Sequence, residues 1–235
     1  REAAEVMKDG YSIFVKDLEE LGYTPEGVIN WISLMGWSYD DHTEFFTVPD
    51  LVDKFSIDHL NPSPAAINFS KLDYFNGLHI RNLSDEDLAE RIKPFLEDAG
   101  YKPDIETLVK LAPILKERLP TLDEVVEKAG FFFRDEVEYP AEELIAKGLE
   151  KPQCLEIIKH TLEIFSNLDS VDKETAEPPM RDLVEKSGFS AGQVFGILRI
   201  AVTGQKVSPP LFESMEIIGR EKVLERIQKA AKLLD

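Results

Sequence analysis

The sequence has almost no cysteine and no long apolar run. Its 235 residues include one cysteine, Cys154, which excludes an internal disulfide and a cysteine-rich zinc site. This scarcity is typical of a protein from a reducing compartment. No apolar stretch approaches the roughly 20 residues that a membrane helix needs, and Arg1 to Glu5 do not lead into the apolar segment of a signal peptide. We therefore expect a cytoplasmic protein without a membrane partner.

Recognisable catalytic motifs are also missing. The sequence has no glycine-rich phosphate loop, no HExxH and no GxSxG. None of its four histidines lies four positions from another histidine or from the cysteine; they are His42, His59, His79 and His160. The sequence therefore predicts no metal site and no catalytic residue. Cys154 stands in a helical run beside Leu155, where a buried and unreactive thiol is expected.

The charge is strongly acidic but unevenly distributed. The chain carries 45 acidic and 27 basic side chains, for a net charge of −18. Residues 196–235 nevertheless hold seven basic and five acidic residues, so this segment is the part better suited to meet an anion such as phosphate. An acidic helical module that binds proteins and no RNA is an alternative interpretation of the same composition.

The start and stop signals of helices predict an all-α fold. Pro25 stands where a helix begins and Gly36 where it ends, and Ser190 with Gln193 forms a capping box before a helix that stops at Gly204. A further helix is expected over 84–100.

Three other segments carry further signals of a helix or a connector. Thr121 with Glu124 predicts a helix from 122 to about Gly130. Ser208 is expected to cap a helix that Pro209 begins. The stretch 169–179 lacks periodicity and contains a Pro-Pro pair, which favours a connector.

Two stretches resemble bacterial-type glutamyl-tRNA synthetases. The first combines the GYTPEGVINWISLMGWS, NPSPA and KLDYFNGLHIR segments at 22–38, 61–65 and 71–81. The second lies within 192–221 and includes Leu198-Arg199, SPPLF at 208–212 and IIGRE at 217–221. The similarity covers essentially the whole chain in the family's order and spacing.

The resemblance implies a domain plan. Residues 1–83 match the stem-contact domain, and 84–168 and 169–235 match two helical subdomains of the α-helical cage that binds the anticodon. Arg1 aligns with the end of the family's KLSKR-type ATP-binding loop, so the catalytic domain is expected to lie outside this chain. The full enzyme would attach glutamate to tRNA(Glu) using ATP and Mg²⁺, whereas this chain would catalyse neither step and hold no cofactor.

The resemblance also implies which residues meet RNA. Arg118, within Glu117-Arg118-Leu119-Pro120-Thr121-Leu122, matches an arginine that reads the third anticodon base in discriminating members. The alternative is a surface arginine that complements a helix dipole. The other positions matching the anticodon pocket are Arg199, Ser208, Pro209, Leu211 and Phe212.

Local structure offers alternative roles for several of these residues. Ser208 suits an N-cap and Pro209 a first helical turn, while Leu211 and Phe212 suit the core. Lys71 and Arg81 are candidates for contact with the tRNA backbone. The expected partner is tRNA(Glu), not DNA, and the expected state is a monomer. A non-discriminating enzyme that also charges tRNA(Gln) is the alternative within the family.

Overall fold

The computed structural model describes residues 7–8, 11–12, 14–61 and 67–235. Arg1 and residues 62–65 of the NPSPA segment lie outside the described residues. The regular secondary structure of the described residues is almost entirely helical, which confirms the predicted all-α fold. Two short strands, β1 (Met7–Lys8) and β2 (Tyr11–Ser12), pair antiparallel. The fold divides into two compact units, residues 1–126 and 127–235. The finer division at 83/84 and 168/169 stays a prediction.

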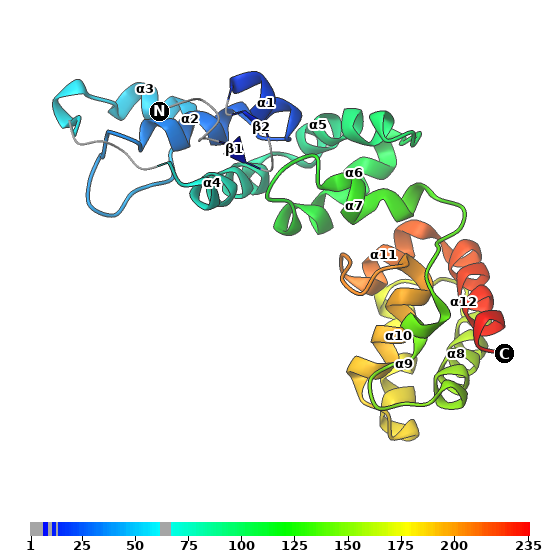
Figure 1. Cartoon of the computed structure of the whole chain (residues 1–235). Coiled ribbons are helices and arrows are strands. Elements are labelled where there is room, and N and C mark those ends of the chain that lie inside the picture. The colour runs from blue at the N-terminus through cyan, green and yellow to red at the C-terminus, as the bar shows by residue number, and fades with distance from the viewer. Residues whose placement is uncertain (1–6, 9–10, 13, 62–66) are drawn as a thin grey trace. The chain divides into compact units, whose positions relative to one another are not determined.

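The first unit contains most of the shorter helices. They are α1 (Val15–Glu20), α2 (Pro25–Ser33), α3 (Val48–Lys54), η2 (Ile57–His59), α4 (Phe69–Asn82), α5 (Asp85–Asp98), α6 (Ile105–Leu115) and η3 (Lys116–Arg118). Figure 1 shows α2 lying beside α4 and α5 beside α6, and these pairs share the most extensive packing of the unit. The core under α2 and α4 is built on Trp31, Leu72 and Phe75.

The second unit is built around a large apolar core. After α7 (Val125–Ala129) and η4 (Gly130–Phe133) come η5 (Ala141–Leu144), α8 (Lys151–Ser166), α9 (Lys173–Ser187), α10 (Ala191–Thr203), α11 (Leu211–Ile218) and α12 (Arg220–Leu234). α8 and α12 pack side by side in Figure 1, and α10 packs on α12. Cys154 is a free, fully buried member of this core, as predicted.

Capping chemistry explains where the predicted helices begin. Pro25 occupies the first turn of α2, and the Thr24 hydroxyl accepts a hydrogen bond from the Gly27 amide. Ser190 and Gln193 form the predicted capping box of α10, which ends at Gly204 in the left-handed conformation. At the start of α5, the Ser84 hydroxyl accepts a hydrogen bond from the Asp87 amide.

Three expectations about local structure are wrong. Thr121 does not start a helix, because the Leu122 amide donates to the Gly22 carbonyl and helical structure begins only at Val125. Ser208 is not an N-cap, since α11 begins after Pro210.

The third correction concerns residues 169–179, which the sequence predicted to be a connector. Most of this stretch belongs to helix α9. An Asp172–Thr175 capping box starts α9, and Pro178 and Pro179 lie inside it. Ala176 and Met180 of this helix are fully buried in the core of the second unit. This packing offsets the backbone hydrogen bonds that the two prolines cannot make.

Candidate functional site

Arg118 stands at the end of η3 on a well-anchored turn. Its neighbour Leu119 is buried, and the Pro120 carbonyl accepts a hydrogen bond from the Asn76 side chain at 2.6 Å. At the start of η3, Lys116 pairs with Asp85 of α5 at 2.6 Å. Arg118 itself is exposed, and within the described part of the chain its guanidinium makes no hydrogen bond or ion pair. The backbone of the turn is therefore held in place, and the guanidinium of Arg118 has N–H donors available to a ligand.

Asn76 organises the support under this turn. Its side-chain oxygen accepts hydrogen bonds from the Thr24 amide and the Thr24 hydroxyl, both at 2.8 Å, while its amide nitrogen donates to Pro120. Asn76 is fully buried, and a Cβ at Gly27 would lie 2.6 Å from its side-chain oxygen. The KLDYFNG segment thus supplies the residue that joins α2, α4 and the Arg118 turn, a positioning role that sequence analysis missed.

A cavity of about 340 Å³ lies beside Arg118 in the first unit. Its walls come from α4 and from the η3 turn; they are Ser70, Asp73, Tyr74, Gly77, Arg81, Glu117, Arg118, Leu119 and Pro120. The structure therefore brings together Arg81 and Arg118, which the sequence placed in separate roles. Arg81 lies 3.7 Å from Glu117, a carboxylate that is largely exposed, so this ion pair is weak and solvated.

Lys71 does not line this cavity. Its ammonium pairs with Glu44 at 2.6 Å and lies 5.6 Å from the centre of the Phe75 ring. The pair is partly exposed, and a phosphate contact by Lys71 would compete with Glu44. Its role toward RNA stays a prediction.

Arg199 holds a loop of the second unit. Its guanidinium donates to the Ser208 carbonyl, the Ser208 hydroxyl and the Pro209 carbonyl. Ser208 and Pro209 are buried beneath these contacts. The arrangement fixes the segment that leads into α11, so Arg199 has a structural role here whether or not it also contacts RNA.

Leu211 and Phe212 are part of the core of the second unit. Leu211 is 5% and Phe212 8% exposed, and the Phe212 ring packs edge-to-face on Phe195 at 5.7 Å. This agrees with the packing alternative left open by the sequence and leaves little ring surface for a base. On the same loop, the exposed apolar side chain is Val207, at 78%. Base contact by Leu211 and Phe212 stays a prediction.

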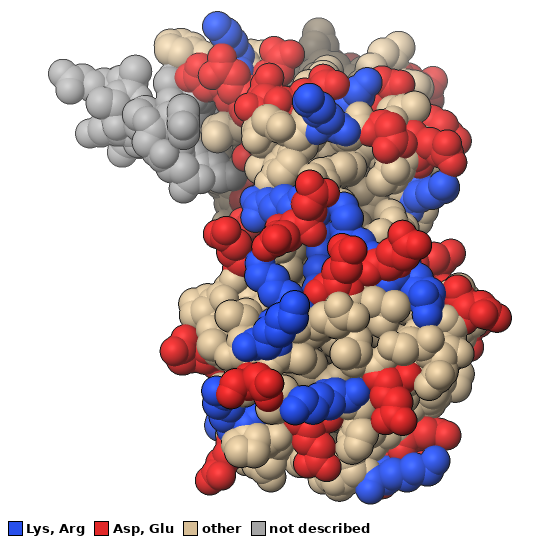
Figure 2. Space-filling model, turned by 90° about the vertical axis from the view of Figure 1, so that its right-hand side faces the viewer, with Lys and Arg blue, Asp and Glu red and all other residues tan. Residues whose placement is uncertain are grey.

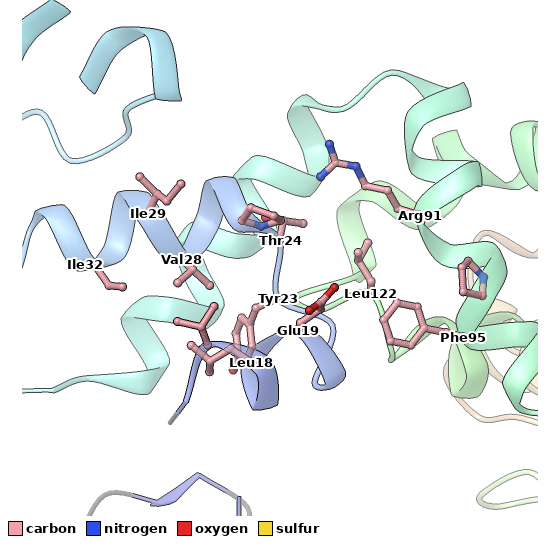
Figure 3. Close-up of a pocket in the computed structure, with 13 residues that line it drawn as sticks. Leu18, Glu19, Tyr23, Thr24, Val28, Ile29, Ile32, Arg91, Phe95 and Leu122 are labelled. Carbon is pink, nitrogen blue, oxygen red and sulfur yellow. The ribbon is translucent and has the colours of Figure 1, made fainter. Parts of the chain in front are cut away.

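A second cavity in the first unit is apolar. Its volume is about 690 Å³, and Figure 3 shows Leu18, Val28, Ile32 and Phe95 around it. The one cation in its lining, Arg91, forms a two-pronged pair with Glu26 at 2.9 Å and also contacts Asp87. Because the guanidinium is occupied, the cavity offers little to a phosphate, and it suits RNA less well than the Arg118 cavity.

The described residues give no support for other chemistry. Their histidine, cysteine and acidic side chains form no group of three that would hold a metal ion. None of the described helices is both long enough and apolar enough to span a membrane. On the face shown in Figure 2, acidic and basic side chains are interspersed.

Comparisons with known proteins point to one family. Residues 87–231 match the family model described as an anticodon binding domain. The chain is 38% identical over 219 residues to a glutamate–tRNA ligase of Dehalococcoides mccartyi, covering 91% of this chain and 45% of that protein. It is 39% identical over 232 residues to the corresponding ligase of Borreliella burgdorferi, covering 95% and 47%.

Solved structures give the same picture. A glutamate tRNA ligase from Elizabethkingia meningosepticum superposes with a TM-score of 0.80 at 25% identity, covering 97% of this chain and 44% of that one. The synthetase from Elizabethkingia anophelis gives a TM-score of 0.76 at 25% identity. The chain spans slightly less than half the length of these proteins.

Proposed function

Because this chain belongs to the anticodon-binding domain family, we propose that it recognises tRNA as part of a glutamate–tRNA ligase. The observation that carries the proposal is the exposed guanidinium of Arg118, which has no hydrogen-bond or ion-pair partner among the described residues and lies at a cavity edge. The relatives of this chain are glutamate–tRNA ligases. In this proposal the partner is tRNA(Glu), the chain acts as a cytoplasmic monomer, and DNA is not a ligand.

Arg118 supplies selectivity for the third anticodon base. A guanidinium has N–H donors and no acceptor. Cytosine offers acceptors on its pairing edge, whereas guanine turns N–H donors toward the same place. Glutamate and glutamine anticodons differ at this base, so Arg118 favours the glutamate tRNA. Arg81 contributes a second cation that contacts the backbone without reading sequence.

The reaction of the whole protein is also part of the proposal. The complete ligase would join glutamate to tRNA(Glu) with ATP and Mg²⁺, which the catalytic domain binds. The described residues of this chain contain no acidic or histidine cluster suited to Mg²⁺ and no phosphate-binding glycine motif. We therefore expect this chain alone to bind tRNA and to form neither glutamyl-adenylate nor glutamyl-tRNA.

Binding of two anticodon stem-loops tests the proposal. The loops are identical except for C or G at the third anticodon base, and affinity is measured over a salt series. We expect the C loop to bind at least about fivefold more tightly, since one correct base contact is worth about 1–3 kcal/mol, and both affinities to fall as salt rises. Arg118→Gln should remove most of the preference. Arg181→Gln, at an exposed arginine of α9, is the matched control and should preserve it.

Three results would contradict parts of this proposal. Equal binding of the two loops would indicate a non-discriminating ligase. A preference unchanged in Arg118→Gln would remove Arg118 from base reading. Failure to bind full-length tRNA(Glu) at low salt would favour the protein-interaction alternative over RNA recognition.

A further inference from the structure

Tyr74 is an exposed aromatic residue in the wall of the Arg118 cavity. Its side chain is 57% exposed, although its neighbours Leu72 and Phe75 on α4 are fully buried. Its ring lies 5.5 Å from the Phe75 ring in a tilted arrangement, so it is supported from within and open on the outside. An exposed aromatic ring beside two guanidinium groups is suited to bind a planar ligand group that stacks on the ring.

The helix places Tyr74, Gly77 and Arg81 on one face. They stand at positions i, i+3 and i+7 of α4, the spacing of residues that line one side of a helix. Because Gly77 has no side chain, the helix backbone between Tyr74 and Arg81 is not covered on this face. A Cβ at Gly77 would lie 3.5 Å from Arg81 Nη1 and 3.7 Å from the Leu119 carbonyl oxygen, so the missing side chain opens the floor of the cavity.

The chemistry of the walls suits a single-stranded nucleotide. Aromatic rings that stack bases and guanidinium groups that contact phosphate are the usual means of holding unpaired RNA. The acidic lining is already engaged, because Asp73 accepts a hydrogen bond from the Tyr23 hydroxyl at 2.5 Å and Glu117 lies beside Arg81. At about 340 Å³ the cavity lies near the lower end of the range for small-ligand pockets.

We propose that Tyr74 is the stacking platform for the unpaired base that Arg118 reads. The base lies against the Tyr74 ring, with its pairing edge toward Arg118. Arg81, which stays beside Glu117 at 3.7 Å, uses its remaining N–H donors to contact the neighbouring phosphate. This inference rests on the proposed function and adds a specificity-determining residue to it, because a base held flat on Tyr74 presents a defined edge to the guanidinium.

A double-mutant cycle between Tyr74 and the base tests the inference. The protein variants are wild type and Tyr74→Leu in the 235-residue chain. The RNA variants are the C stem-loop and the same loop with an abasic site at the third anticodon position. We expect Tyr74→Leu to weaken binding of the C loop by about tenfold. On the abasic loop, wild type and Tyr74→Leu should bind equally, because no base remains to stack.

Three further variants separate stacking from other effects. Tyr74→Phe keeps the ring and should retain the wild-type affinity. Tyr39→Leu removes an exposed tyrosine outside the cavity and should leave RNA binding unchanged. Gly77→Ala adds a methyl group to the cavity floor within ordinary contact distances. It should weaken binding of the C loop severalfold while the melting temperature stays constant or rises.

The outcomes distinguish this inference from the proposed function. If the wild-type chain binds the C loop and Tyr74→Leu binds it equally well, the stacking role is wrong while RNA recognition stands. If Tyr74→Leu loses the same factor on the abasic loop, its effect does not pass through the base and the inference is again overturned. If the wild-type chain binds neither loop nor full-length tRNA, the proposed function fails and the inference with it.

Discussion

Arg226 is a charged residue in the interior of the second unit. It is 2% exposed and donates to the carbonyls of Val202 at 2.7 Å, Phe131 at 2.9 Å and Arg134 at 2.7 Å. Burial lowers the pKa of Arg226 to about 10, so its guanidinium is still protonated at neutral pH. One side chain of α12 thereby ties the end of α10 to the segment around η4.

Replacement of Arg226 by methionine should destabilise the second unit. Methionine keeps an unbranched apolar stem but leaves three carbonyls without their donor, and each unsatisfied buried group costs about 1–3 kcal/mol. We expect a loss of about 3 kcal/mol or more, measured by urea unfolding. Lys232→Met, at an exposed position of the same helix, is the control and should change stability by less than about 0.5 kcal/mol. Equal effects of the two changes would show that these hydrogen bonds contribute little.

Arg199 shows how a residue's role depends on its surroundings. In the sequence, Arg199 and the loop at Ser208 and Pro209 match positions of the family's anticodon pocket. The positive charge of an arginine also suits contact with RNA. In the structure the same guanidinium stabilises that loop through Ser208 and Pro209. Arg118, which has no partner among the described residues, is therefore the stronger candidate for base reading.

The turn that carries Arg118 is stabilised from a distant part of the sequence. Gly22 ends α1 with a φ of 76°, and its carbonyl accepts from the Leu122 amide at 2.8 Å. A Cβ at Gly22 would lie 2.4 Å from the Asp123 amide nitrogen. The position therefore requires glycine both for its backbone conformation and for the close approach of the turn.

Two glycine substitutions separate these requirements. Gly100 also has a positive φ, of 88°, but a Cβ there would meet no atom within 4 Å. Gly100→Ala should cost about 1 kcal/mol of conformational strain. Gly22→Ala should cost about 3 kcal/mol, since the turn must also move, and it should weaken the preference for the C loop. Thermal unfolding and stem-loop binding provide the measurements. Similar costs at both positions would argue against close packing of the turn.

The acidity of the chain affects the stability of the whole molecule. With a net charge of −18, negative side chains repel one another, and this repulsion weakens as carboxylates begin to protonate. Carboxylates whose pKa is lowered by folding have the opposite effect, because their protonation destabilises the folded state. Hydrogen bonds from Arg91 hold the pKa of Glu26 below its usual value of 4.5, and those from Thr47 lower the pKa of Asp50 to about 2. Hydrogen bonds from Ser170 and then Thr175 lower the pKa of Asp172 in the second unit.

The sign of these shifts predicts the pH at which stability is lost. A carboxylate whose pKa is lower in the folded state contributes stability above its unfolded pKa, and that contribution disappears as the pH falls through the folded pKa. Burial lowers the pKa of His79, so its imidazole binds a proton less readily in the folded state than in the unfolded state. The folded state is therefore also destabilised as the pH falls below the unfolded pKa of 6.5. We expect the urea midpoint to fall most steeply between about pH 4.5 and 2. A midpoint that stays constant to pH 2 would contradict this.

The sequence alone determined the helical fold class and most of the helix ends. Proline at first turns, Ser190 with Gln193 and glycine at the ends of helices act through local hydrogen bonds and backbone angles, so the sequence contains the information. The same reasoning was wrong at 121–124 and in α9. There a distant carbonyl at Gly22, or core packing around Met180, overrides the local signal.

Tertiary structure alone decided which candidate side chains line one cavity and which are buried or engaged elsewhere. The resemblance placed Arg118 and Arg81 in different roles, but packing of α4 against the η3 turn brings them to one cavity and adds Tyr74 and Gly77. It also buries Phe212 and engages Arg199. Exposure and hydrogen-bond partners depend on residues tens of positions away, and a local sequence pattern does not specify those neighbours.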